Sequence, residues 1–295
     1  MTSILIITSA PWEMRVEDRR SEIKKIIMDT RTLPTLPGVI LKLNELSESN
    51  RASVQEMARI VTSDQALSAR ILRLANSPSY GFYRVSTISN AMILLGVNVV
   101  KSLALSSSFF EIMENDSVGL WEHSLGVGAA ANLIAGKLKL PESEEIATAG
   151  LLHDIGKVVI SLKCRDAESR IRSAVREKQL FSREAEQEML DTDHAEVGAW
   201  LAKCWFLPDK LSEPIAFHHD VSRAMNHRVK TAVVHLADVL IKASGFGNGG
   251  DCLVPLIQQE AWDLLRLTDQ QLAELVDELE DKLIEVKCFS QEMQA

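Results

Sequence analysis

The spacing of apolar residues along the chain is typical of helices rather than strands. Val39, Leu43 and Leu46 are separated by four and three residues, which places them on one face of a helix. The same reading predicts further helices over residues 53–61, 64–75, 88–95, 97–110, 118–138, 142–153, 168–178, 193–205, 209–219 and 228–243. No segment alternates apolar and polar residues as a half-buried strand would. We therefore expect an all-α fold.

Two segments interrupt this pattern. The polar run Asn115-Asp116-Ser117 separates two halves of the chain, and the glycine-rich run from Gly245 to Gly250 ends the second half. The sequence therefore predicts a mobile tail, an N-terminal helical subdomain, a helical core and a pair of C-terminal helices. Their expected bounds are residues 1–14, 15–116, 117–243 and 252–290.

A last helix is expected from about Thr268, which forms a capping box with Gln271. Its apolar residues recur at spacings of four, three, four and three: Leu272, Val276, Leu279, Leu283 and Val286. Such a stripe fits either a helix that docks on its own domain or a short seam between two copies of the chain. We expect docking within the chain, and a dimer is the alternative.

Composition and charge narrow the classes of function. The formal net charge of -9 argues against non-specific binding to nucleic acid, which needs a surplus of Lys and Arg. No apolar run is long enough to span a membrane. The four cysteines are far apart and form no CxxC pair, so a zinc ribbon is excluded. Scattered cysteines are typical of a reducing compartment, and we expect a cytoplasmic protein.

The dipeptide His153-Asp154 is the first candidate for metal chemistry. Consecutive side chains on a helix point about 100° apart, so both can reach one ion at a helix end. His123 shares an apolar helix face with Val127, and Asp238 lies within an apolar helix. Because a buried carboxylate is costly unless it is paired or binds a metal, these positions indicate a metal site.

His194 and the pair His218-His219 complete a set of five imidazoles and two carboxylates. Any one of these side chains alone is more often a packed, hydrogen-bonded residue, but together they suffice for two divalent ions. The expected cofactor is therefore one or two ions of Fe, Mn, Zn, Ni or Mg. We expect His227 in a solvated loop. His235 is expected either to pack in its helix or to support the ligands.

Lys157 follows His153 by four residues, which is about one helical turn. Its ammonium group could contact a substrate phosphate. Alternatively, it is a lysine at the C-terminus of a helix, where the helix dipole favours a cation. The spacing alone does not distinguish these two roles.

The order His123, His153-Asp154, Asp238 resembles the H…HD…D signature of the HD superfamily of metal-dependent phosphohydrolases. Four stretches of the first half resemble the HDOD family specifically: Leu33-Pro34-Thr35-Leu36-Pro37, Ile60-Val61-Thr62-Ser63-Asp64-Gln65-Ala66-Leu67, Leu74-Ala75-Asn76-Ser77 and Ala91-Met92-Ile93-Leu94-Leu95-Gly96. The resemblance spans residues 30 to 240 or so. It implies an HDOD fold, in which an N-terminal helical bundle packs on an HD-type helical core.

The resemblance also implies how the metal ligands are shared. His123, His153, Asp154 and Asp238 would hold one ion. His194 and His218-His219 are similar to the extra ligands of the related HD-GYP phosphodiesterases and would hold a second ion, with Asp154 as the bridge.

Two features depart from the HD-GYP pattern. The residues after His219 begin Asp220-Val221-Ser222, with no Gly-Tyr-Pro. Gly119 stands four residues before His123, where some HD-GYP enzymes have a carboxylate for a third metal. We therefore expect neither recognition of cyclic di-GMP nor a three-metal centre.

HDOD proteins are similar to HD-GYP phosphodiesterases in fold, but many members have lost metal ligands and are regarded as output or signalling modules in bacteria. Here every ligand position is filled. We expect a bacterial cytoplasmic signalling or regulatory module that retains a two-metal centre and contacts a signalling protein. The alternative is a metal-dependent phosphohydrolase acting on a phosphorylated small molecule, either a nucleotide or a cyclic dinucleotide. In that enzyme Asp154 and Lys157 would be catalytic, with Lys157 stabilising developing charge.

Overall fold

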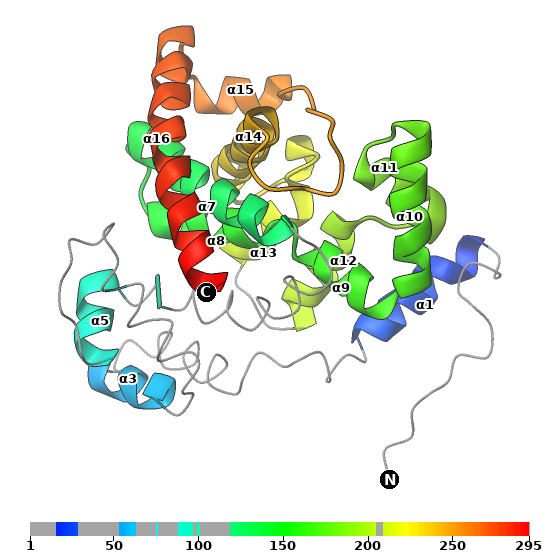
Figure 1. Ribbon diagram of the computed structural model, residues 1–295, viewed down its shortest axis with the longest axis horizontal. Coiled ribbons are helices and arrows are strands. Elements are labelled where there is room, and N and C mark those ends of the chain that lie inside the picture. The colour runs from blue at the N-terminus through cyan, green and yellow to red at the C-terminus, as the bar shows by residue number, and fades with distance from the viewer. Residues whose placement is uncertain are drawn as a thin grey trace.

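The computed structural model describes residues 16–28, 53–62, 75, 88–96, 99–100, 119–204 and 209–294. Within these ranges every regular element is a helix, which confirms the all-α prediction (Figure 1). In chain order the helices are α1 (Val16–Met28), α3 (Val54–Thr62), α5 (Ile88–Leu95), α7 (Leu120–Lys137), α8 (Ser143–Leu152), α9 (Ile155–Lys163), α10 (Arg165–Lys178), α11 (Ser182–Leu190), α12 (His194–Cys204), α13 (Asp209–Phe217), the 3₁₀ turn η3 (Val221–Arg223), α14 (Arg228–Ser244), α15 (Gln259–Leu265) and α16 (Asp269–Gln294). None of them is long and apolar enough to cross a bilayer.

Helices α3, α5, α7, α8, α12, α13 and α14 confirm predicted helices to within a few residues. Helix α10 begins three residues before its predicted start, and the pattern does not predict α1, α9 or α11. The helices expected around Val39 and over 64–75 and 97–110 lie outside the described residues, except for Ala75, Val99 and Val100, which are helical. The tail over 1–14 and the break at 115–117 also lie outside them.

Two large apolar clusters organise the described helices, beside a small third one of Ala149, Leu211 and Val234. In the first, Ile155 and Val159 of α9 pack with Leu201 of α12 and with Ile23 of α1. Helix α1 therefore contacts the core helix α12, although it belongs to the predicted N-terminal subdomain. In the second cluster, α7 lies between α8, α14 and α16. These contacts place the ends of several helices at one point of the structure.

The contact between α9 and α12 depends on a glycine. A Cβ atom built on Gly156 would lie 1.9 Å from the carbonyl oxygen of His194. Only a residue without a side chain allows this close approach of two helix backbones. The approach matters for the site because it brings the turn that carries His153 and Asp154 against the start of α12.

The last helix docks on its own domain, as predicted. Leu279 and Leu283 of α16 are buried in the second apolar cluster, where α16 packs against α7. The predicted stripe is wrong at Val276, which is 40% exposed, because Leu275 takes its place in the core. The buried residues Leu275, Leu279 and Leu283 are therefore each four residues apart. Side chains at this spacing form a ridge along the helix, which packs into the groove of a neighbouring helix.

Substituting Leu279→Glu is expected to destabilise the protein without changing its oligomeric state. Leu279 is 4% exposed, so the variant loses its packing and buries a carboxylate. The free energy of unfolding should fall by about 3 kcal/mol, which lowers the thermal midpoint by about 10 °C. Val276→Glu is the matched control on the same helix and should change the midpoint little. A shift in sedimentation mass for Leu279→Glu would instead indicate a dimer seam.

Candidate metal centre

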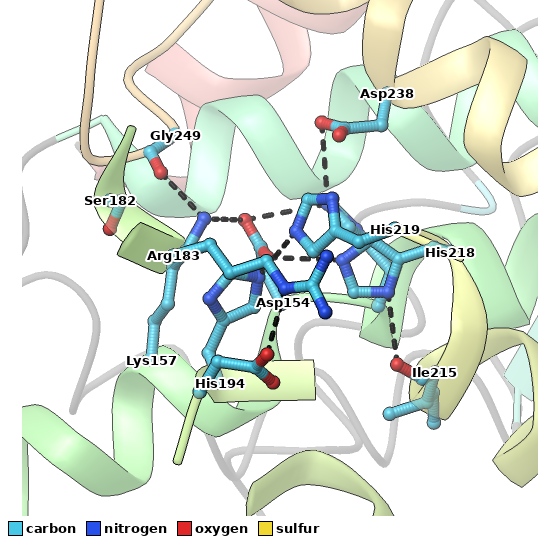
Figure 2. Close-up of polar contacts among 12 residues, drawn as sticks. Asp154, Lys157, Ser182, Arg183, His194, Ile215, His218, His219, Asp238 and Gly249 are labelled. Atoms are coloured by element: carbon cyan, nitrogen blue, oxygen red, sulfur yellow. Dashed lines mark hydrogen bonds and ion pairs between the residues drawn. The ribbon is translucent and has the colours of Figure 1, made fainter. Parts of the chain in front are cut away.

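The structure brings all seven predicted metal ligands to one point (Figure 2). They come from the first turn of α7, the turn between α8 and α9, the start of α12, the end of α13 and the middle of α14. Their nitrogen and oxygen atoms fall into two groups, and within each group the atoms lie within 4.8 Å of one another. One group is His123, His153 and Asp238, and the other is Asp154, His194, His218 and His219.

Asp154 lies between the two groups and faces both. Its Oδ2 is 3.4 Å from Nε2 of His153 and 3.7 Å from Nε2 of His123. Its Oδ1 is 3.1 Å from Nε2 of His194 and 3.9 Å from Nε2 of His218. One carboxylate therefore offers a separate oxygen to each group, which is the arrangement of a bridging ligand.

The inner atoms of the cluster face one another, with His123 Nε2 3.1 Å from Asp238 Oδ1, but they make no hydrogen bonds with described residues. Nε2 of His123, His153 and His218 and Oδ1 of Asp154 and Asp238 are buried, and no described residue hydrogen-bonds to them. These five residues are at most 2% exposed. Buried polar atoms without partners are costly and uncommon in folded proteins. The donor set and the orphaned atoms both fit divalent metal ions, which would supply the missing partners.

Backbone carbonyls orient two of the imidazole rings. Nδ1 of His153 lies 2.7 Å from the carbonyl oxygen of Gly150, and Nδ1 of His218 lies 2.9 Å from that of Ile215. In these pairs the ring nitrogen must be the donor, which assigns the proton to Nδ1. Each Nε2 then presents a lone pair to the interior of the cluster, as a metal ligand requires.

Burial and neighbouring charges shift the pKa values of the cluster in opposite directions. Burial raises the pKa of the Asp154 and Asp238 carboxyls, but the adjacent histidines outweigh it and hold both pKa values well below the usual range. Burial lowers the pKa of His153, but Asp154 and Asp238 raise it to about 9. For His218, burial and the neighbouring imidazoles hold the pKa well below its usual value. These shifts favour ionised carboxylates and a proton on His153, which a bound metal ion would displace.

Lys157 is tied directly to the centre. Its Nζ donates to Oδ2 of Asp154 at 2.7 Å and to the carbonyl oxygen of Gly249 at 2.6 Å. It lies in the first turn of α9, so its interpretation as a lysine at a helix C-terminus is wrong. The same glycine-rich loop covers the first group, since a Cβ on Gly249 would lie 3.3 Å from the His123 ring.

Sequence reasoning missed Glu186. This side chain is 2% exposed, and its Oε2 accepts hydrogen bonds from Nδ1 of His194 at 2.6 Å and from the backbone N–H of His194 at 2.8 Å. Ser182 Oγ donates to its other oxygen at 3.2 Å. His194 is thus oriented by a carboxylate, whereas His153 and His218 are oriented by carbonyls. Nothing in the charged sequence of α11 distinguishes Glu186 from its neighbours.

A second support holds the His218-His219 pair. Nδ1 of His235 donates to the carbonyl oxygen of His218 at 2.8 Å, and Nε2 of His235 accepts from the backbone N–H of Gln258 at 3.0 Å. The Gln258 side chain donates to the carbonyl oxygen of His219 at 2.6 Å. His235 therefore supports the ligands through the backbone. His227 precedes α14 and is half-buried.

Replacing Glu186→Gln is expected to weaken the second metal group selectively. Glutamine keeps an acceptor for His194 but removes the negative charge that strengthens the imidazole as a ligand. We expect the affinity of one ion to fall by about 10- to 100-fold, as is typical of changes to such supporting residues, while the other ion is retained. Metal content after dialysis against a weak chelator measures this.

Glu188→Gln removes the same charge from an exposed position of α11, where Glu188 pairs with Lys178, and is the matched control. Equal metal content in the two variants would show that Glu186 does not influence the site.

Comparison with known proteins places the whole arrangement in a family. The sequence profile of the HDOD domain matches residues 33–221. The chain belongs to the HDOD family. The match covers both the first-half stretches that resembled HDOD proteins and most of the predicted ligands. HDOD membership therefore accounts for the all-helical architecture, and Asp238 lies outside the matched residues.

Solved HDOD-type structures share this fold. An HDOD domain protein of unknown function from Geobacter sulfurreducens is 28% identical, with a TM-score of 0.77 over 93% of this chain and 97% of that one. A candidate phosphohydrolase from Shewanella amazonensis SB2B is 24% identical, with a TM-score of 0.69 over 90% and 97%. An uncharacterised protein of Treponema pallidum (strain Nichols) is 25% identical over 72% of this chain, which spans only 43% of that relative.

Proposed function

We propose that the chain is an HDOD regulatory module that holds two divalent ions as part of its folded core. The observation that carries this proposal is the set of buried, unpartnered ligand atoms around Asp154. His123, His153 and Asp238 would hold one ion with Oδ2 of Asp154. The other ligands, His194, His218 and His219, would hold the second with Oδ1.

The donor set narrows the choice of metal. Five imidazoles and two carboxylates suit iron, manganese, zinc or nickel, whereas magnesium prefers oxygen ligands almost exclusively. The ligands come from five places in the fold, so bound ions would connect α7, α8, α12, α13 and α14. Binding free energy at such a site adds to the stability of the fold. A module of this kind can report metal binding to a signalling protein through its conformation.

The free thiols support a cytoplasmic location for the proposed module. Cys164, Cys252 and Cys288 are free, and the last two are exposed. Unpaired exposed thiols persist in reducing surroundings, which supports a cytoplasmic module.

Removal of the ions is the experiment that tests this function. At an ion concentration 1,000-fold above the Kd, each ion stabilises the folded state by about 4 kcal/mol. Exhaustive chelation should therefore lower the thermal midpoint by more than about 10 °C, and a twofold molar addition of Mn²⁺ or Zn²⁺ should restore it. An unchanged midpoint in protein shown to have lost its ions would mean that they are not part of the core.

Phosphoester hydrolysis is the second candidate, and the position of Lys157 favours it. Lys157 combines a hydrogen bond to the bridging carboxylate with a place in the wall of a cavity of about 650 Å³. When bound, divalent ions polarise a phosphoryl oxygen and lower the pKa of a bound water. The Lys157 ammonium would orient Asp154 and stabilise negative charge that develops on the phosphoryl group.

For the hydrolase, Lys157→Ala is expected to lower the turnover of an aryl phosphate ester by at least tenfold while leaving most of the metal in place. Arg170→Ala, on an exposed arginine of α10 outside the lining of this cavity, is the control and should leave the turnover unchanged. If fully metallated wild-type protein cleaves no phosphoester or nucleotide in a broad panel, the hydrolase proposal is wrong and the regulatory proposal remains.

A further inference from the structure

Two cavities meet beside the second metal group. The larger, of about 620 Å³, is lined by Arg183, Trp200, Phe217, His219 and Arg223 among others. The smaller, of about 180 Å³, is lined by Arg183, His194 and His219 together with residues of the loop before α15. Arg183 and His219 line both cavities. The second metal group is therefore approached from the surface past the guanidinium of Arg183.

One N–H group of the Arg183 guanidinium, that of Nε, holds the side chain in place. Its Nε donates to Oδ2 of Asp193 at 2.7 Å. Asp193 is itself fixed, because it accepts from the Gln187 side chain at 3.0 Å and from the backbone N–H of Glu196 at 2.9 Å. Among the residues that the structure describes, the two terminal nitrogens of Arg183 have no hydrogen-bond partner. In the view of Figure 2 the guanidinium is drawn in front of the histidine cluster, and Arg183 lines both cavities together with His219.

Two divalent ions bound at the centre would leave an excess of positive charge beside Arg183. A cation fixed beside a site for two divalent ions is repelled by them unless an anion lies between. Asp193 pairs with Arg183 only through Nε. Two other carboxylates that line the larger cavity are engaged elsewhere, since Glu196 pairs with Arg20 and Asp220 accepts from the Ser222 hydroxyl. Arg223 adds a second guanidinium 5.1 Å from the centre of the Phe217 ring. An anionic ligand would complete this arrangement.

We propose that Arg183 binds the phosphoryl group of a phosphate ester of nucleotide size at the second metal group. The free edge of its guanidinium carries two donors in the geometry that binds a phosphate through two oxygens. The phosphoryl group would lie in the smaller cavity, and the organic part would lie in the larger one against Trp200 and Phe217. This inference rests on the proposed metal centre, but it holds whether or not the ester is hydrolysed.

Titration of inorganic phosphate and of adenosine 5′-monophosphate into metal-loaded protein tests this by calorimetry. Arg183→Gln should weaken binding of both by about tenfold or more, with the metal content unchanged. Arg183→Lys keeps a charge beside Asp193 but not the planar pair of donors, and it should bind phosphate more weakly than wild type. Arg170→Gln, at an exposed position of α10, should bind as wild type does.

The outcomes separate this inference from the proposed function. Wild-type protein that takes up no ions overturns the proposed function. Wild-type protein that holds two ions but binds neither ligand overturns this inference alone. If both Arg183 variants bind the two ligands as tightly as wild-type protein does, then Arg183 does not contact the phosphoryl group. If adenosine monophosphate binds no tighter than inorganic phosphate, then the Trp200 and Phe217 wall does not hold the organic part.

Discussion

In Asp154→Ala protein, we expect the loss of both metal ions. Asp154 is the residue that offers an oxygen to each group, with Oδ2 toward His153 and Oδ1 toward His194. Its removal takes a ligand from both ions and also the charge that separates them. Metal content should fall from about two ions per chain to near zero, measured by elemental analysis after purification under identical conditions.

Two companion variants make this result specific. His218→Ala removes a ligand of the second group only, so it should lose about one ion and retain the other. Asp166→Ala removes an exposed carboxylate from α10 and should retain both. Retention of both ions by Asp154→Ala would contradict the bridging role, and loss of both by His218→Ala would show that the two groups do not bind separately.

The affinity for metal should fall steeply as the pH is lowered. Without metal, burial lowers the pKa of His153, but Asp154 and Asp238 raise it to about 9, so His153 carries a proton at neutral pH. A metal ion must displace that proton, because only neutral imidazole binds it. The apparent Kd of the first group should therefore rise about tenfold for each pH unit below about 9.

The metal affinity of the second group should also fall as the pH is lowered. Burial lowers the pKa of His194, but Glu186 and Asp154 raise it above its usual value, so a metal ion competes with a proton at this ring too. Calorimetric titration of Zn²⁺ at pH 6, 7 and 8, in buffers of different ionisation enthalpy, yields the affinity and the number of protons released. Equal affinity at pH 6 and pH 8, with no proton release, would show that the histidines are neutral beforehand.

Much of the candidate site could be predicted from the sequence because its ligands violate the apolar pattern around them. His123 and Asp238 stand in apolar helices, where a polar side chain requires a partner. Lys157 was recognisable as a neighbour of the ligands, but its role depended on where α9 begins. The pattern placed His153 at the end of a helix, and the structure shows a turn followed directly by a new helix.

The supporting residues could not be predicted in the same way. Glu186 and Arg183 lie on α11, a short helix rich in charged residues whose buried face is not visible as an apolar stripe. Their roles come from tertiary contacts with His194 and Asp193, which lie on the far side of a turn. Helix α9 was also missed because Gly156 weakens its helical pattern, although that glycine is what allows α9 to contact α12.

Elemental analysis of wild-type protein purified without oxygen or chelator tests the central claim most directly. The buried donors around Asp154 predict about two atoms of iron, manganese, zinc or nickel per chain. Asp154→Ala protein purified in the same way should contain almost none of these metals. Wild-type protein that is folded yet contains no transition metal, and takes up none when Mn²⁺ or Zn²⁺ is supplied, would contradict the account.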